Sequence, residues 1–200
     1  MRSGLVVVVP ASRPNYFELF GIPKGFQIDP RDLEKRFYDL SRQNHPDRFA
    51  QAGPQALQKA LETMSALNEG YRVLKDRGLL RGYLLETSGV DVAGERSSGT
   101  PQGLPMELAE AWFDVQDRVM EGDAGVVQAV LQIEQQLVDL QQSVEARLVS
   151  LEREADEALK LQGEAAWASK LQLIGKELKT VSYLTSMLRD VKQLQAKLKG

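Results

Sequence analysis

The chain has 200 residues, 42% of them hydrophobic and 26% charged, which is the composition of an ordinary globular protein with one large domain or two small ones. It has no cysteine and one histidine, which excludes disulfides, thiolate nucleophiles, Cys-ligated zinc or iron–sulfur clusters and metal sites that need two imidazoles. The net charge of −3 is unevenly divided, because residues 1–90 carry 13 Lys/Arg and 10 Asp/Glu whereas residues 91–200 carry 12 and 18. Neither part has the dense basic stripe of a nucleic-acid-binding protein, so we expect two modules with different partners and no nucleic acid.

The first residues show no signal for export or for a membrane. The longest apolar run, Leu5–Val9, ends at Pro10 and is too short for the core of a signal peptide or for a membrane span. We therefore predict a flexible leader over residues 1–14, a cytoplasmic location and no membrane partner.

The segment 15–87 has the pattern of a small helical domain. Asp29 and Pro30 suit the N-cap and the first position of a helix, and this helix must end before Pro46, because a residue before proline avoids the α conformation. About nine residues then lead to the next helix, and such a short connection predicts an antiparallel pair. In chain order, the predicted helices cover 15–20, 30 to before Pro46, 55–74 and 79–85.

Residues 88–104 are rich in glycine and serine and lack helical periodicity, which predicts a linker. The segment 105–200 then follows with long helical patterns. Its first helix is predicted from Pro105, in the first turn, to about Glu121, and Asp123 suits the N-cap of the next helix.

Two long helices end the chain, separated at Gly163, and each has one hydrophobic stripe at steps of three and four residues. Helices of about 35 residues reach roughly 50 Å, and neither can bury such a stripe alone, so we predict an antiparallel hairpin. The expected fold is all-α: an antiparallel helical hairpin with short flanking helices, followed by a three-helix bundle built on the long hairpin.

The sharpest motif is His45-Pro46-Asp47, in the connection between the two helices of the first hairpin. A simple turn would explain the tripeptide, because proline fixes the backbone and aspartate bonds back to the chain. Its position indicates a more specific role than a turn, since it follows Leu33, Phe37 and Leu40 and precedes the run 67–76 at fixed offsets.

This constellation, over about residues 15–77, resembles the J domain of DnaJ-type co-chaperones. Further details resemble one subgroup, the HscB (Jac-type) co-chaperones of iron–sulfur cluster assembly: the opening run 16–23, Arg48-Phe49-Ala50 after the tripeptide, and Tyr83-Leu84-Leu85. The helical region 105–200 is similar to that subgroup as well, and it does not resemble the Gly/Phe-rich and zinc-bearing regions of DnaJ.

The resemblance implies a chain that is not an enzyme and needs no cofactor or metal. The tripeptide would dock on a DnaK/HscA-class chaperone ATPase and trigger its ATP hydrolysis, with His45 as a rigidly held imidazole, Pro46 as the fixed bend and Asp47 as a carboxylate for an arginine of the partner. The basic residues expected to meet an acidic patch on that ATPase are Lys35, Arg36, Arg42 and Arg48.

The second helix departs from the general J-domain pattern. Tyr38, Asp39 and Gln43 stand where Lys or Arg is frequent, and Asn44 replaces an aromatic just before the tripeptide. These departures favour a dedicated HscA-like partner over a general chaperone.

The resemblance also implies that residues 105–200 bind the scaffold protein on which the cluster is built (IscU-type). In the family the contacts come from apolar and acidic residues of the first helix of this region and an aromatic of the last. The residues expected to form this surface are Leu104, Met106, Leu108, Glu110, Asp117 and Tyr183. Ala109 and Phe113 depart from the Leu and Glu expected there, and Tyr183 matches if about one helical turn is inserted before it.

Two other functions remain open. The chain could be a J-domain adaptor for a different client, or a structural coiled-coil protein that dimerises through its long helices, so a homodimer is the alternative to the expected monomer. A hydrolase that uses His45 is disfavoured, because no serine or carboxylate arrangement around it reads as a triad and no glycine-rich phosphate loop is present.

Overall fold

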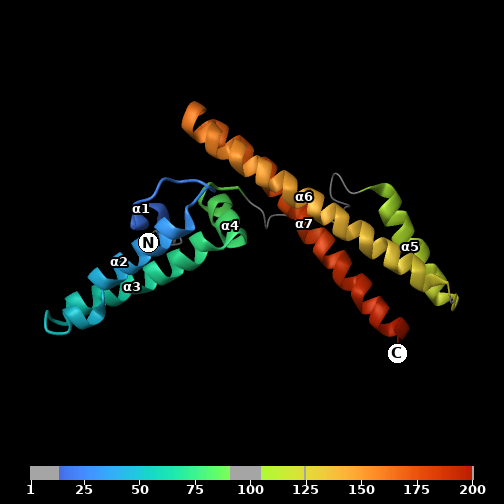
Figure 1. Cartoon of the computed structure of the whole chain (residues 1–200), viewed down its shortest axis with the longest axis horizontal. Helices are drawn as coiled ribbons and strands as arrows, with labels where there is room; N and C mark the ends of the chain where they lie inside the picture. Colours follow the sequence, from blue (N-terminus) through green and yellow to red (C-terminus); the bar gives the residue numbers. More distant parts are fainter. Residues whose placement is uncertain (1–13, 91–104, 124, 200) are drawn as a thin grey trace, which may run out of the picture. The chain divides into compact units, whose positions relative to one another are not determined.

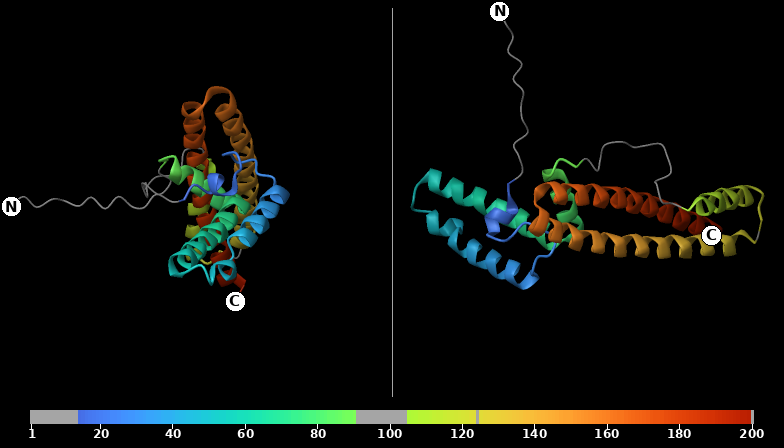
Figure 2. Two further views of the ribbon diagram at one scale, coloured as in Figure 1. Left: turned by 90° about the vertical axis from the view of Figure 1, so that its left-hand side faces the viewer. Right: turned by 90° about the horizontal axis from the view of Figure 1, so that it is seen from above.

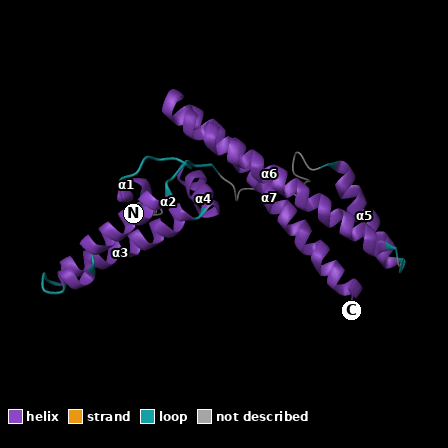
Figure 3. Cartoon of the chain, viewed as in Figure 1, coloured by secondary structure: helices purple, strands orange, loops and turns teal. Residues whose placement is uncertain are grey.

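The structure is a computed structural model that describes residues 14–90, 105–123 and 125–199. Every regular element in these ranges is helical (Figure 3), which confirms the predicted all-α class. The chain divides into two compact units, Met1–Thr87 and Ser88–Gly200. The predicted leader and linker fall almost wholly outside the described residues. No helix in the described ranges is both long enough and apolar enough to cross a membrane.

Local capping explains where the helices of the first unit begin. Asp29 is the N-cap of the second helix, where its carboxylate accepts the N–H of Arg31 at 2.9 Å, and Pro30 occupies the first position as predicted. The last helix is longer than predicted, because the Asp76 carboxylate accepts the N–H of Leu79 at 2.9 Å and adds a turn at its start. The elements are α1 (Tyr16–Phe20), α2 (Pro30–Gln43), a 3₁₀ turn η1 (Pro46–Phe49), α3 (Pro54–Lys75) and α4 (Arg77–Thr87).

The helices α2 and α3 lie side by side as an antiparallel pair (Figure 1). Leu33 of α2 is buried, and the ring of Phe37 stacks on Tyr71 of α3 with 4.4 Å between the ring centroids. The ammonium group of Lys75 lies 5.2 Å from the centroid of the same tyrosine ring. An apolar and aromatic seam therefore holds the two helices together along the pair.

The short helix α1 packs on α3 at Gly70. A Cβ added at Gly70 would lie 2.8 Å from Cδ1 of Tyr16 and 2.9 Å from Cε2 of Phe20, so glycine alone permits this approach. The hydroxyl of Tyr83 in α4 accepts the N–H of Tyr16 at 3.0 Å and donates to the carbonyl of Pro14 at 2.9 Å. These contacts fix α1 on the two helices beneath it.

The second unit consists of a long hairpin and a shorter helix: α5 (Met106–Met120), α6 (Val126–Gln162) and α7 (Glu164–Lys199). α6 and α7 run beside one another (Figure 2), joined at Gly163, whose φ is +85°. Most residues of the predicted stripes are buried between the two helices, and the remaining ones are partly buried: Leu140, Leu151, Leu178, Val181, Leu194 and Leu198. The innermost members of the stripes are Val130, Leu137, Val144 and Leu148 of α6 and Trp167, Leu171, Ile174, Leu184 and Val191 of α7.

Polar pairs also join the two helices of this hairpin. Lys170 donates to Glu154 at 2.6 Å, and this bond holds the pKa of the Glu154 carboxyl below its ordinary value. Nearer the start of α6 and the end of α7, Gln195 donates to Glu134 at 2.6 Å. The two pairs lie toward opposite ends of α6, so the helices remain in one register along their length.

The start of α6 differs from the prediction, because Gly125 rather than Asp123 is its N-cap. The Asp123 carboxylate accepts the N–H of Gly125 and the guanidinium of Arg118, each at 2.8 Å, so it closes the turn between α5 and α6. The Gly125 N–H, followed by Arg118, holds the pKa of the Asp123 carboxyl below its ordinary value. The two helices that this turn joins, α5 and α6, pack against each other.

The close approach at Gly70 generates a stability prediction. Gly70→Ala is expected to lower the free energy of unfolding of the first unit by about 1–3 kcal/mol, because the added methyl group must displace two buried rings. Gly82→Ala is the matched control, since a Cβ at this position in α4 meets no atom within 4 Å. Urea unfolding followed by circular dichroism, with hydrogen exchange of α1 and α3 amides, measures both. Equal stability of the two variants would contradict the packing described.

Candidate functional site

The connection between α2 and α3 presents the His45-Pro46-Asp47 tripeptide on the surface. Pro46 opens the 3₁₀ turn η1, and His45 is its N-cap. The Nδ1 atom of the imidazole accepts the N–H of Asp47 at 3.3 Å, and the carbonyl of His45 accepts the N–H of Arg48 at 3.0 Å. The His45 and Asp47 side chains are 53% and 89% exposed, so the turn is folded and also open to a partner.

The imidazole of His45 is engaged within the turn through one ring nitrogen. Its Nδ1 atom lies 3.3 Å from the backbone nitrogen of Asp47 and 3.3 Å from a carboxylate oxygen of the same residue. The Asp47 carboxylate lies 3.3 Å from Nδ1, and its exposed oxygens remain available as acceptors. The pair therefore places an imidazole and a charged acceptor together on a short segment of backbone.

Contacts on both sides hold the turn in place. Asn44, which replaces the expected aromatic, ends α2: its side-chain amide donates to the carbonyl of Leu40 at 2.8 Å and its backbone N–H to the same carbonyl at 3.0 Å. The guanidinium of Arg48 donates to the carbonyl of Arg42 at 3.2 Å, and η1 packs against α3. The 3₁₀ turn could not be predicted from the sequence, because a single turn has no periodicity to detect.

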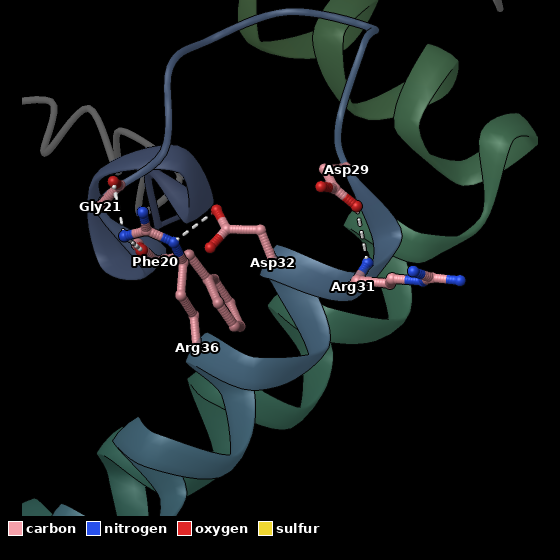
Figure 4. A network of polar contacts seen from close by, with 6 residues as sticks. All are labelled: Phe20, Gly21, Asp29, Arg31, Asp32 and Arg36. Carbon is pink, nitrogen blue, oxygen red and sulfur yellow. Dashed lines mark hydrogen bonds and ion pairs between the residues drawn. The ribbon is translucent and has the colours of Figure 1, made fainter.

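The structure gives Arg36 a contact within the chain (Figure 4). Its Nε donates to Asp32 at 2.8 Å, and its terminal nitrogen donates to the carbonyls of Phe20 and Gly21 at 3.2 and 3.0 Å. These carbonyls end α1, so Arg36 ties α2 to the C-terminal end of that helix. The guanidinium of Arg36 is therefore already bonded within the unit, which argues against its predicted role as a contact for a partner.

The other predicted basic residues point outward. Lys35 and Arg48 are exposed, and Arg42 is 78% exposed with one ion pair to Asp39 at 3.3 Å. Tyr38 shares this face of α2 and is 58% exposed. The result is a weakly basic surface with an aromatic near its centre, beside the His45-Pro46-Asp47 turn.

The predicted scaffold-binding residues of α5 are partly exposed and partly buried in the structure. Met106 is 71% exposed, and Glu110 and Asp117 are exposed on the same side of the helix. Leu108 is only 4% exposed and packs inside the unit, which corrects the expectation that it belongs to the binding surface. Tyr183 is half-buried on α7. Leu104, the remaining predicted contact, lies outside the described residues.

Two further residues of α5 expose large apolar side chains and were not among the predicted contacts. Phe113 and Met120 are 66% and 79% exposed, at steps of seven residues from Met106. The signal in the sequence was this spacing, which places the three side chains on one side of a helix. Within the described ranges, no three His, Asp or Glu side chains gather into a group that could hold a metal ion.

Comparison with known proteins adds independent information. No model of a protein family matches the chain. It is 36% identical to the co-chaperone protein HscB homolog of Vibrio atlanticus (strain LGP32) over 168 residues, which cover 80% of this chain and 96% of that protein. It is 27% identical to the homolog of Vibrio campbellii (strain ATCC BAA-1116) over 190 residues, 93% of this chain and 99% of that protein. The solved structure of chaperone HscB from Vibrio cholerae matches with a TM-score of 0.53 and 23% identity, covering 92% and 99% of the two chains, which supports a common fold.

The position of Arg36 predicts a stability effect. Arg36→Gln is expected to lower the free energy of unfolding by about 1 kcal/mol, because two carbonyls at the end of α1 lose a charged donor while the site stays partly open to water. Arg42→Gln, which removes one exposed ion pair, should change it by less than about 0.5 kcal/mol. Urea midpoints of the full chain compare the variants. If both lose the same stability, Arg36 does not anchor α1.

Proposed function

The chain belongs to the HscB family of co-chaperones, and from this premise we propose that it stimulates ATP hydrolysis by a DnaK/HscA-class chaperone and delivers to it an IscU-type scaffold protein for iron–sulfur clusters. The first unit contributes the His45-Pro46-Asp47 turn and the second unit the scaffold-binding surface. The observation that carries the proposal is a folded, exposed His-Pro-Asp turn held between two packed helices. We also propose a cytoplasmic monomer with no membrane or nucleic-acid partner.

The turn supports activation of a partner rather than catalysis by this chain. Asp47 offers an exposed carboxylate that can accept a charge-assisted bond from an arginine of the chaperone ATPase, and His45 places its imidazole beside that carboxylate. Pro46 fixes the backbone between them, so docking requires little further ordering. The chain would contribute no group to the hydrolysis itself, which takes place in the ATPase.

The surface around the turn supports a selective encounter. Lys35, Arg42 and Arg48 remain as outward cations for an acidic patch on the ATPase. Asp39 neutralises part of this charge, and the exposed Tyr38 adds an apolar contact. This surface has a weak positive charge and an exposed aromatic side chain near its centre. It therefore fits a dedicated HscA-like chaperone, which can match the shape of this face, better than a general chaperone.

The second unit supports the scaffold-binding role through α5 and α7. Met106 exposes a large apolar side chain, and Glu110 and Asp117 place carboxylates beside it. Tyr183 on α7 is half-buried. An apolar centre with a charged rim is the ordinary anatomy of a protein interface. An adaptor with the same J-domain activity but a different client is the alternative, and binding of a purified cluster scaffold protein separates the two.

The first test addresses the turn. His45→Gln should bring the ATP turnover of a purified DnaK-class chaperone close to its unstimulated rate, because the imidazole that caps the turn is lost. The unfolding transition should not change. Gln51→Ala, an exposed substitution in the same connection, is the control and should stimulate like the unmodified chain. Full stimulation by the His45 variant would remove the role assigned to the tripeptide.

The second test addresses delivery of the scaffold. Met106→Gln and Tyr183→Gln should each weaken the additional stimulation that the scaffold protein produces, while stimulation by the co-chaperone alone remains. Leu161→Gln is the control, because Leu161 is 81% exposed at the far end of α6. ATP turnover with and without scaffold measures both effects. Unaltered turnover in the scaffold-loaded reaction would place the binding surface elsewhere.

A further inference from the structure

A groove with a volume of about 560 Å³ runs along the C-terminal half of α7 in the second unit. Leu188, which is only 8% exposed, lies in its floor, and Gln141 of α6 borders it. At about 100° per residue, Tyr183 lies about 120° around α7 from Arg189, so the groove is on a different face from the proposed scaffold contact. The remaining lining residues all belong to α7: Thr185, Arg189, Lys192, Gln193 and Ala196.

The groove is positively charged, although the second unit as a whole is acidic. The excess of cations comes from α7, which carries seven Lys/Arg and three Asp/Glu, whereas α6 carries three and seven. Among the lining residues, all of which the structure describes, none is aspartate or glutamate. The two cations of the groove therefore meet no carboxylate on its walls.

These two cations are also not used to hold the hairpin together. Arg189 donates to the hydroxyl of Ser186 at 3.4 Å, and neither Arg189 nor Lys192 forms an ion pair within the described ranges. Elsewhere on the hairpin, Lys170 pairs with Glu154 at 2.6 Å and joins the two helices. Arg189 and Lys192 are exposed and form no such link, so their charges are available to an anionic ligand.

The shape of the groove favours an extended polypeptide segment over a small ion or a helix. Five of the seven lining residues are exposed, so a small ligand would stay largely in water, whereas specific small-molecule sites bury most of their ligand. The lining positions of α7, from Thr185 to Ala196, span about 17 Å, which about five residues of extended chain cover. Leu188 alone offers too little buried apolar surface for an amphipathic helix.

We propose that this groove binds an extended acidic segment of a partner protein. Two carboxylates of the segment pair with Arg189 and Lys192, which lie about one helical turn apart, and one apolar side chain lies over Leu188. The side-chain amide of Gln193 can donate to the backbone of the segment and accept from it. The groove shares no residue with the two surfaces of the proposed function, so this inference does not rest on that function.

The test is a fluorescence-anisotropy titration of the full chain into a labelled peptide of about six residues in which glutamate and leucine alternate. Arg189→Gln and Lys192→Gln should each weaken binding by about threefold, and the double variant by about tenfold, because each substitution removes one exposed charge pair. Raising the ionic strength should weaken binding by the unmodified chain and reduce the difference between the variants. Both side chains are exposed, so the unfolding curves should not change.

Lys176→Gln is the matched control, because it removes the same charge from the same helix. Lys176 is exposed and lies about 140° around α7 from Arg189, and this variant should bind like the unmodified chain. Equal weakening by the three single substitutions would indicate a general attraction to a basic helix and would overturn the proposal. Equal binding of a peptide with glutamine in place of glutamate would also overturn it, as would no binding of the glutamate peptide to the unmodified chain.

Competition separates an acidic segment from other anions. Inorganic phosphate and single-stranded oligothymidine are added to the complex with the labelled peptide at matched ionic strength, and neither should displace the peptide. Displacement by phosphate would assign the groove to small anions, and displacement by the oligonucleotide would assign it to nucleic acid. Either result would overturn the proposal.

Discussion

The packing of α2 against α3 is the contact on which the proposed activity depends, because each helix holds one end of the His45-Pro46-Asp47 turn. The stack of Phe37 on Tyr71 and the buried Leu33 fix the distance between the helices. Within that frame, hydrogen bonds of the 3₁₀ turn set the directions of the imidazole and the carboxylate. A partner therefore meets a surface that is already ordered, and little binding energy is lost in shaping it.

The remaining elements of the first unit support this frame indirectly. α1 is too short to be stable alone, and it is held by the close approach at Gly70, the Tyr83 hydroxyl and the Arg36 guanidinium. Arg36 shows why a basic residue on the expected face of a helix is not by itself a partner contact. Its charge is used inside the unit, whereas Lys35 and Arg42 point outward.

The second unit separates stability from recognition. The long stripes of α6 and α7 bury one another within the chain, so the hairpin has no need of a second copy to cover them. This burial weakens the alternative of a coiled-coil protein that dimerises through these helices. α5 uses one side for its attachment to α6, and its other side is exposed. A stable hairpin with a small attached helix thus provides a rigid base for the scaffold-binding surface proposed above.

The amino-acid sequence predicts the helices, their approximate ends and the tripeptide, because periodicity, N-caps, prolines and glycines act over a few neighbouring residues. It does not predict the 3₁₀ turn, the contact of Arg36 or the N-cap at Gly125, since each depends on how the chain folds around it. The clearest case is α5, where Leu108 and Val115 form one apolar row at a seven-residue step and Met106, Phe113 and Met120 form another. Periodicity alone makes the two rows equivalent. Only the packing of α5 on α6 buries the first row and leaves the second exposed, because a helix lying against a single neighbour can cover one side and not the other.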